Sequence, residues 1–200
     1  MLRFASFLPF AFFCSAVFGQ QAVVSNPFVA GRSAEPEIGT FTNNRFHHNL
    51  TGTEFSLPAG WIVTYQGKSS GGGEQVGFTF SSDSGQPLIS AFVWMKPESR
   101  KPDQIPDQLR SAVEFKAGQR QAGMANYQML RKTIERRAVA GQQALSVLAH
   151  YLEGAAPMTE YHTWAISGKT SVYVSARMRE ADFENLKVKV DEILDTFLIP

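Results

Sequence analysis

The stretch Glu54-Phe-Ser-Leu-Pro-Ala-Gly-Trp61 sets the fold expected of the whole chain. Phe55 and Leu57 alternate with polar residues, which is typical of a half-buried strand. Pro58 ends this strand because proline has no amide proton for the ladder, and the glycine two positions later permits a tight turn. Trp61 then opens a second strand that is rich in β-branched and aromatic residues. We expect two strands joined by a Pro-x-Gly turn, with Trp61 packed in the core rather than lining a ligand site.

Hydrophobic periodicity predicts the remaining elements outward from this turn. Strands are predicted at residues 46–57, 61–65, 76–80 and 88–95, and again at 128–139, 143–153, 158–166 and 170–177. The glycine-rich segment Ser69–Gly73 is predicted to be a loop. Residues 106–118 are predicted to be a helix, because Pro102 and Asp103 form a typical helix start. A last helix is predicted between Phe183 and Phe197, where apolar residues recur at three- and four-residue steps.

Glycines predict the turns between the last four strands. Gly141-Gln142 and Gly168-Lys169 each fit a two-residue hairpin loop with glycine first. Gly154-Ala-Ala-Pro157 fits a wider turn. Four consecutive antiparallel strands follow from these three turns.

The Gly168-Lys169 loop also predicts which side chains share a face of the sheet. It pairs Trp164 with Tyr173 on one face and Ala165 with Val172 on the other. Both faces are then partly apolar, and both must be covered. We therefore expect an α+β fold, in which an antiparallel sheet of about six or more strands is sandwiched between helices.

Composition and charge narrow the classes of function. Of the 200 residues, 44% are hydrophobic and 18% are charged, which is typical of a globular domain. Nineteen basic and eighteen acidic residues give a formal net charge of +1. This near balance removes the simplest electrostatic argument for nucleic acid or an anionic membrane as a partner.

The N-terminal residues predict export. Residues 1–19 fit a signal peptide, since Arg3 precedes an almost wholly apolar run. Cleavage would also remove Cys14, the only cysteine, and with it disulfides, thiolate catalysis and cysteine metal sites. Residues 20–44 are rich in small and polar residues and are expected to form a flexible tether, and residues 45–200 to form one domain. We expect a secreted protein, periplasmic or extracellular, with no transmembrane segment after cleavage.

Three short motifs give the chain a resemblance to the PsbP-like superfamily. They are Phe55-Ser-Leu-Pro-Ala-Gly-Trp61, Gly141-Gln-Gln-Ala144 and Ile193-Leu-Asp-Thr-Phe197, which occur in the order and spacing of that superfamily. The superfamily includes the extrinsic photosystem II subunit, a Ran-binding import factor and many bacterial secreted proteins. The resemblance covers about residues 46–200 and implies an antiparallel sheet between helices. It implies a binding or assembly role and no activity, and it assigns no site residue.

Two histidines form the candidate ligand site. If the turn between them is centred on Ala156, His150 and His162 face each other across adjacent strands, with Glu160 nearby. Two histidines and a carboxylate can bind zinc, and with Trp164 they could line a cleft for a small ligand. The alternative is that the histidines only form hydrogen bonds in a partly covered sheet. We expect no bound metal or cofactor and no catalytic residue, because the chain has no Gly-x-Ser-x-Gly nucleophile motif.

Basic residues mark one predicted strand at both ends. Arg131, Lys132, Arg136 and Arg137 would protect an edge strand against aggregation, or they would form a surface for a partner. The edge at the Ser69–Gly73 loop is a second candidate surface. The leading interpretation is a secreted, non-enzymatic binding or accessory module whose partner is another protein and not nucleic acid. The alternative is a protein that binds a small ligand or metal near His150, His162 and Trp164.

Overall fold

The computed structural model describes residues 38–69, 72–124 and 126–200. The predicted signal peptide and most of the predicted tether lie outside these residues. The tether was expected to reach residue 44, but strand β1 (Gly39–Thr42) lies inside that range and pairs with β2 (Arg45–His48). The turn between them is formed by Asn43 and Asn44, whose φ angles are 51° and 63°. Asparagine is among the few residues that accept this left-handed conformation. The two asparagines therefore allow a hairpin to form inside the segment that was predicted to be a tether.

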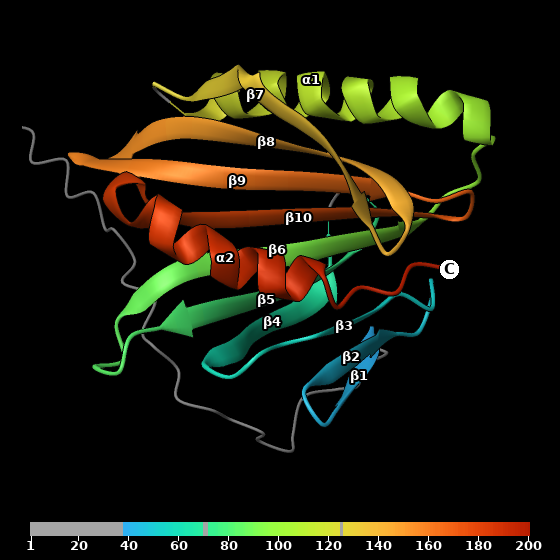
Figure 1. Cartoon of the computed structure of the whole chain (residues 1–200), viewed down its shortest axis with the longest axis horizontal. Helices are drawn as coiled ribbons and strands as arrows, with labels where there is room; N and C mark the ends of the chain where they lie inside the picture. The colour runs from blue at the N-terminus through green and yellow to red at the C-terminus, as the bar shows by residue number, and fades with distance from the viewer. Residues whose placement is uncertain (1–37, 70–71, 125) are drawn as a thin grey trace, which may run out of the picture. The chain divides into compact units, whose positions relative to one another are not determined.

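The main sheet has seven strands, and every neighbouring pair is antiparallel. Figure 1 shows it as the layer between the two helices. Its strands, in spatial order, are β4 (Trp61–Lys68), β5 (Glu74–Ser81), β6 (Pro87–Pro97), β10 (Thr170–Arg179), β9 (Ala156–Ile166), β8 (Gln142–Glu153) and β7 (Gln128–Val139). This arrangement confirms the expected sheet of six or more strands.

A second sheet of three strands precedes the main one. It has the order β1-β2-β3, with β3 at Glu54–Ser56. The single strand predicted at residues 46–57 was therefore wrong, because a turn closed by Gly52 folds β3 back onto β2. Phe55 is fully buried and stacks on Phe197, with ring centroids 5.1 Å apart. The small sheet thus shares its core with the C-terminal end of the chain.

The strand registers test the predicted turns one by one. The loop at Gly168-Lys169 is confirmed, since Trp164 pairs with Tyr173 and Ala165 with Val172. The β7–β8 hairpin turns at Ala140-Gly141, one residue earlier than predicted, because Val139 pairs with Gln142. Both turn residues have positive φ, 52° and 74°, which is the geometry of the two-residue turn that matches strand twist.

The third turn was predicted too far along the chain. Glu153 pairs with Ala156, so the turn consists of Gly154 and Ala155 alone. Pro157 lies inside β9, opposite Leu152, instead of ending the turn. The register of β8 against β9 is therefore displaced by three residues from the one centred on Ala156. An odd displacement exchanges the faces of the sheet, with consequences for the histidines described below.

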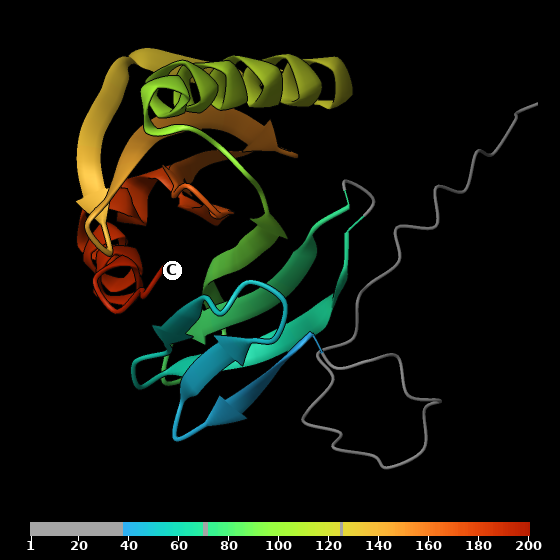
Figure 2. The same ribbon diagram turned by 90° about the vertical axis from the view of Figure 1, so that its right-hand side faces the viewer.

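The two helices cover opposite faces of the sheet, as Figure 2 shows. Helix α1 (Ile105–Gly123) buries its apolar stripe of Leu109, Val113 and Ala117 against residues of β8, β9 and β10. Helix α2 (Phe183–Leu194) packs on the other face, in the same core as the small sheet. Short 3₁₀ turns precede both helices, at Pro102–Gln104 and Glu180–Asp182.

Trp61 lies in the larger core, as expected. Its side chain is 9% exposed and meets the Phe78 ring edge-on at 5.3 Å. Gly60, with a φ of 88°, is needed in the turn before it, because a Cβ atom there would lie 2.8 Å from the Phe80 ring. The Pro-x-Gly turn therefore places an aromatic residue of the core at the start of β4.

Candidate functional site

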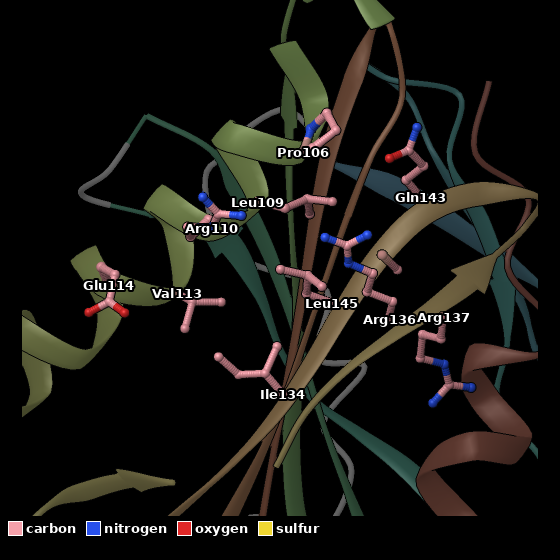
Figure 3. A pocket seen from close by; sticks show the side chains of 11 residues that line it. Pro106, Leu109, Arg110, Val113, Glu114, Ile134, Arg136, Arg137, Gln143 and Leu145 are labelled. Atoms are coloured by element: carbon pink, nitrogen blue, oxygen red, sulfur yellow. The ribbon is translucent and has the colours of Figure 1, made fainter. Parts of the chain in front are cut away.

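A groove lies between α1 and the β7–β8 edge of the main sheet, on the face that α1 covers (Figure 3). Its volume is about 270 Å³. Most of its lining is apolar and comes from Pro106, Leu109, Val113, Ile134, Ala144 and Leu145. The polar lining consists of Arg110, Glu114, Arg136, Arg137 and Gln143. The groove exists because α1 crosses β8 and β9 and leaves the last strand of the sheet partly uncovered.

The predicted basic surface is divided by the pleat of β7. Arg136 is exposed, pairs with Leu145 across the ladder and lies on the α1 side of the sheet. Figure 3 shows Arg137, the next residue, directed toward α2. Its Nη1 donates to Asp191 Oδ1 and to the Tyr161 hydroxyl, each at 2.8 Å. Consecutive strand residues point in opposite directions, so the Arg137 guanidinium is held on the α2 side although both arginines border the groove.

Arg137 has a structural role in holding α2 on the sheet. Burial lowers its pKa, but hydrogen bonds to Asp191 and Tyr161 and the charge of Asp191 outweigh burial, so the pKa is raised overall. Burial in turn raises the pKa of Asp191, and hydrogen bonds from Lys187 and Arg137 lower it below its usual value. Both groups are therefore charged near neutral pH, and they form an ion pair.

Arg131 and Lys132 lie at a bulge in β7. Pairing with β8 is interrupted between Leu130 and Glu135. Arg131 makes two hydrogen bonds to Glu114 of α1, at 2.6 and 3.0 Å, while Lys132 is exposed. Arg131 thus links the edge strand to the helix that forms the other wall of the groove.

Arg110 and Arg136 differ from these paired residues. Both are exposed, and neither makes an ion pair or a side-chain hydrogen bond with any residue in the described part of the chain. Glu114, the one acidic residue of the lining, is occupied by Arg131. The groove therefore combines an apolar floor with two arginines that have no counter-charge.

The predicted ligand site at the histidines is not assembled. His150 pairs with Thr159, whereas His162 pairs with Val147, so the two histidines lie on opposite faces of the sheet. His150 is partly exposed, with Nδ1 3.6 Å from Glu180 Oε1. His162 is fully buried, and Trp164 is 7% exposed. The expected facing of His150 and His162 was wrong because the turn lies at Gly154-Ala155.

A buried polar network surrounds His162 beneath α1. The Tyr127 hydroxyl lies 2.8 Å from Nε2, and the Tyr173 hydroxyl 2.7 Å from Nδ1. Glu160 lies on the same face, with Oε2 3.6 Å from His162 Nε2. Arg120 of α1 and Ser175 donate to Glu160 Oε1 at 2.8 and 2.6 Å. In a neutral imidazole one nitrogen donates and the other accepts, so one tyrosine donates to His162 and the other accepts.

The charges of this network follow from its burial. Burial lowers the pKa of His162 to about 4, and it raises the pKa values of Tyr127 and Tyr173, so all three are neutral near pH 7. Burial also raises the pKa of Glu160, but His162, Arg120 and the hydrogen bond from Ser175 outweigh burial and lower it overall. An ionised Glu160 thus faces Arg120. With Glu160 and His162 shielded from solvent, this arrangement fixes α1 to β9 and offers no path to a substrate.

Within residues 38–69, 72–124 and 126–200, no group of three or more His, Cys, Asp or Glu side chains is arranged to hold a metal ion. In that same part of the chain, no helix has the length and apolar character needed to cross a membrane. The Ser69–Gly73 loop includes residues 70 and 71, which lie outside the described residues. Gly73 packs against the Trp94 indole, where a Cβ atom would clash.

Comparison with known proteins places the fold. No protein-family model matches the chain, and no curated protein matches it by sequence. Among solved structures, cyanobacterial PsbP from Synechocystis sp. PCC 6803 is 15% identical, with a TM-score of 0.59 over 86% of this chain and 99% of that one. A protein from Bacteroides thetaiotaomicron is 9% identical, with a TM-score of 0.51 over 74% of this chain. This chain spans only 45% of that protein's length.

These matches show the fold class that the motifs indicated. The chain has a PsbP-like fold, an α+β sandwich with an antiparallel sheet between two helices. At such identities the likeness concerns architecture alone. The groove was missed by sequence reasoning, because no local pattern distinguishes Arg110, which has no counter-charge, from Arg131, which is paired. The one signal in the sequence was the apolar stripe of Leu109 and Val113, which marks the face of α1 that forms one wall of the groove.

Proposed function

We propose that this chain is a secreted, non-enzymatic accessory module that binds another protein through the groove between α1 and β7–β8. The observation that carries the proposal is the pair of exposed arginines without counter-charge, Arg110 and Arg136, above an apolar floor. Arginine beside apolar surface is the composition enriched at protein–protein interfaces. The chain as a whole is nearly neutral, with a formal net charge of +1. The two arginines in the groove therefore form a local positive charge that stands out from the rest of the chain.

A non-enzymatic role is supported by the position of the perturbed titratable groups. His162 and Glu160 have the altered pKa values that often mark catalysis, but both side chains are fully buried and bonded to neighbours. The alternative of a ligand site at His150, His162 and Trp164 finds no support in this geometry. Export is supported by the basic start and apolar run of residues 1–19.

The experiment is a comparison of bound partners between matched charge variants. The test variant is Arg110→Glu/Arg136→Glu, which reverses both groove charges. The control is Lys68→Glu/Arg179→Glu, which reverses two exposed charges on other elements. Tagged proteins are expressed in the source cells, cross-linked and analysed by mass spectrometry. We expect the test variant to lose a partner that the wild type and the control retain. An identical set of cross-linked partners for all three proteins would contradict the proposal.

A further inference from the structure

The outer edge of β7 is open for pairing. β7 is the last strand of the seven-stranded sheet, and no strand in the described part of the chain pairs with its outer side. Between Glu135 and Val139 it pairs with β8 without interruption. Alternate residues of this five-residue segment thus present backbone donors and acceptors outward in regular strand geometry. Such an edge is a template for an added strand.

The bulge sets where that template begins. The Thr133 hydroxyl accepts a hydrogen bond from the Leu148 amide at 3.0 Å and donates to the Leu130 carbonyl at 2.7 Å. A side chain thus replaces the ladder partner of Leu148, and residues 131–134 leave the regular register. Pairing with a further strand is therefore confined to the segment that follows the bulge, residues 135–139.

Side chains at this end of β7 alternate in direction. Ile134 and Arg136 line the groove, while the Arg137 side chain, which also borders it, is bonded to Asp191 on the α2 side. A strand lying beside β7 alternates in the same way, so one of its residues lies next to Ile134 at the end of the bulge, and the residue two positions along faces Arg136. The first position favours an apolar side chain, and the second favours a carboxylate within reach of Arg136 and Arg110.

We propose that the groove receives an extended segment of the partner protein, which adds a strand to the edge of β7. The segment carries an acidic and an apolar residue separated by one position, and both side chains enter the groove. The residue between them faces the side of Glu135, so it is neutral or basic. This inference rests on the proposed function and specifies the kind of partner that the groove accepts.

Charge and size favour this occupant over two others. A second copy of the chain paired through β7 would place the unpaired Arg136 side chains of both copies at one interface, and like charges across a ladder are destabilising. A volume of about 270 Å³ lies just below the roughly 300–1,000 Å³ of small-molecule pockets. The groove therefore suits one or two side chains of a peptide better than a complete lipid.

The test uses labelled peptides and the purified protein. Thr-Val-Glu-Lys-Leu-Thr-Val and Thr-Val-Leu-Lys-Glu-Thr-Val cover the two possible strand orientations, and binding is measured by fluorescence anisotropy. We expect one of them to bind, and replacement of its glutamate by lysine to weaken binding by about tenfold. Arg110→Glu/Arg136→Glu is expected to weaken binding by a similar factor, and Lys68→Glu/Arg179→Glu to leave it unchanged.

Backbone modification separates strand addition from simple contact with the groove. Methylation of the peptide amides that would face β7 is expected to abolish binding, and the unmodified peptide is expected to slow hydrogen exchange of the residue 135–139 amides. Equal binding of the methylated peptide would overturn strand addition while leaving the groove as a protein-binding site. Binding of laurate without binding of either peptide would overturn the peptide assignment. If neither peptide binds but Arg110→Glu/Arg136→Glu still loses its cellular partner, this inference fails and the proposed function stands.

Discussion

Lowering the pH from 7 to 4 is expected to destabilise the protein through His162. Burial holds its pKa at about 4 in the folded protein, against 6.5 in an unfolded chain. The unfolded state therefore takes up a proton at a higher pH than the folded state. The stability contributed by the neutral ring is complete above pH 6.5 and is lost as the pH falls toward 4. Since one pKa unit corresponds to about 1.4 kcal/mol, the loss approaches about 3 kcal/mol.

The charged groups around the ring explain why protonation does not simply stabilise it. The Glu160 carboxylate raises the pKa of His162, but burial dominates, and the positive charges of Lys116 and Arg120 lower it further. Tyr127 and Tyr173 occupy both ring nitrogens. A second proton on the ring would require both hydroxyls to accept, so one of them would have to reorient.

The assay is urea unfolding at several pH values between 7 and 4, with linear extrapolation of the free energy of unfolding. His162→Gln keeps a donor and an acceptor but cannot titrate. His150→Gln removes a histidine that is partly exposed and serves as the control. We expect His150→Gln to lose as much stability as the wild type across this range, and His162→Gln to lose about 3 kcal/mol less.

Two outcomes would refute this reasoning. One is a loss of stability in His162→Gln that equals the loss in the wild type over the same range. The other is a direct NMR titration in which the His162 ring takes up its proton near pH 6.5. If His162→Gln is too unstable for urea unfolding, the titration of the wild-type protein alone decides the matter.

Two further predictions concern a buried ion pair and a strained turn. Arg120→Ala is expected to lower the free energy of unfolding by about 3 kcal/mol, because it leaves the buried Glu160 carboxylate without its counter-charge. The double variant Arg120→Met/Glu160→Gln should cost less than the sum of its single changes, and additive costs in urea unfolding would contradict this coupling. Ala140→Gly is expected to raise stability by about 1 kcal/mol, because Ala140 has a φ of 52° that glycine adopts without strain. A lower melting temperature for Ala140→Gly would show that the turn carries no such strain.

Local sequence patterns were sufficient to predict strand register where a single turn sets the pairing of two strands. The loop at Gly168-Lys169 is bounded by apolar alternation on both sides, so its register could be counted along the chain and was correct. The turn near Pro157 could not be counted in this way, because the pattern assigns Pro157 to the turn, whereas Pro157 lies inside β9. That single misplacement put His150 and His162 on one face, although they lie on opposite faces.

The class of fold follows from local signals along the chain. Alternation, glycine turns and the helical stripe between Phe183 and Phe197 predicted an antiparallel sheet between two helices, because each of these signals depends on neighbours along the chain. The Pro-x-Gly turn before Trp61 likewise predicted a core anchor.

The roles of the charged residues, in contrast, depend on contacts between distant parts of the chain. Arg136 and Arg137 are adjacent in sequence and both border the groove, yet Arg136 has no partner among the described residues while Arg137 is bonded to Asp191 of α2, because the pleat turns them in opposite directions. Arg131 is paired with Glu114 of α1, 17 positions away in the sequence, whereas Arg110 has no counter-charge in the part of the chain that the structure describes. Such pairings depend on which elements meet in space, and the groove exists because α1 leaves β7 partly uncovered.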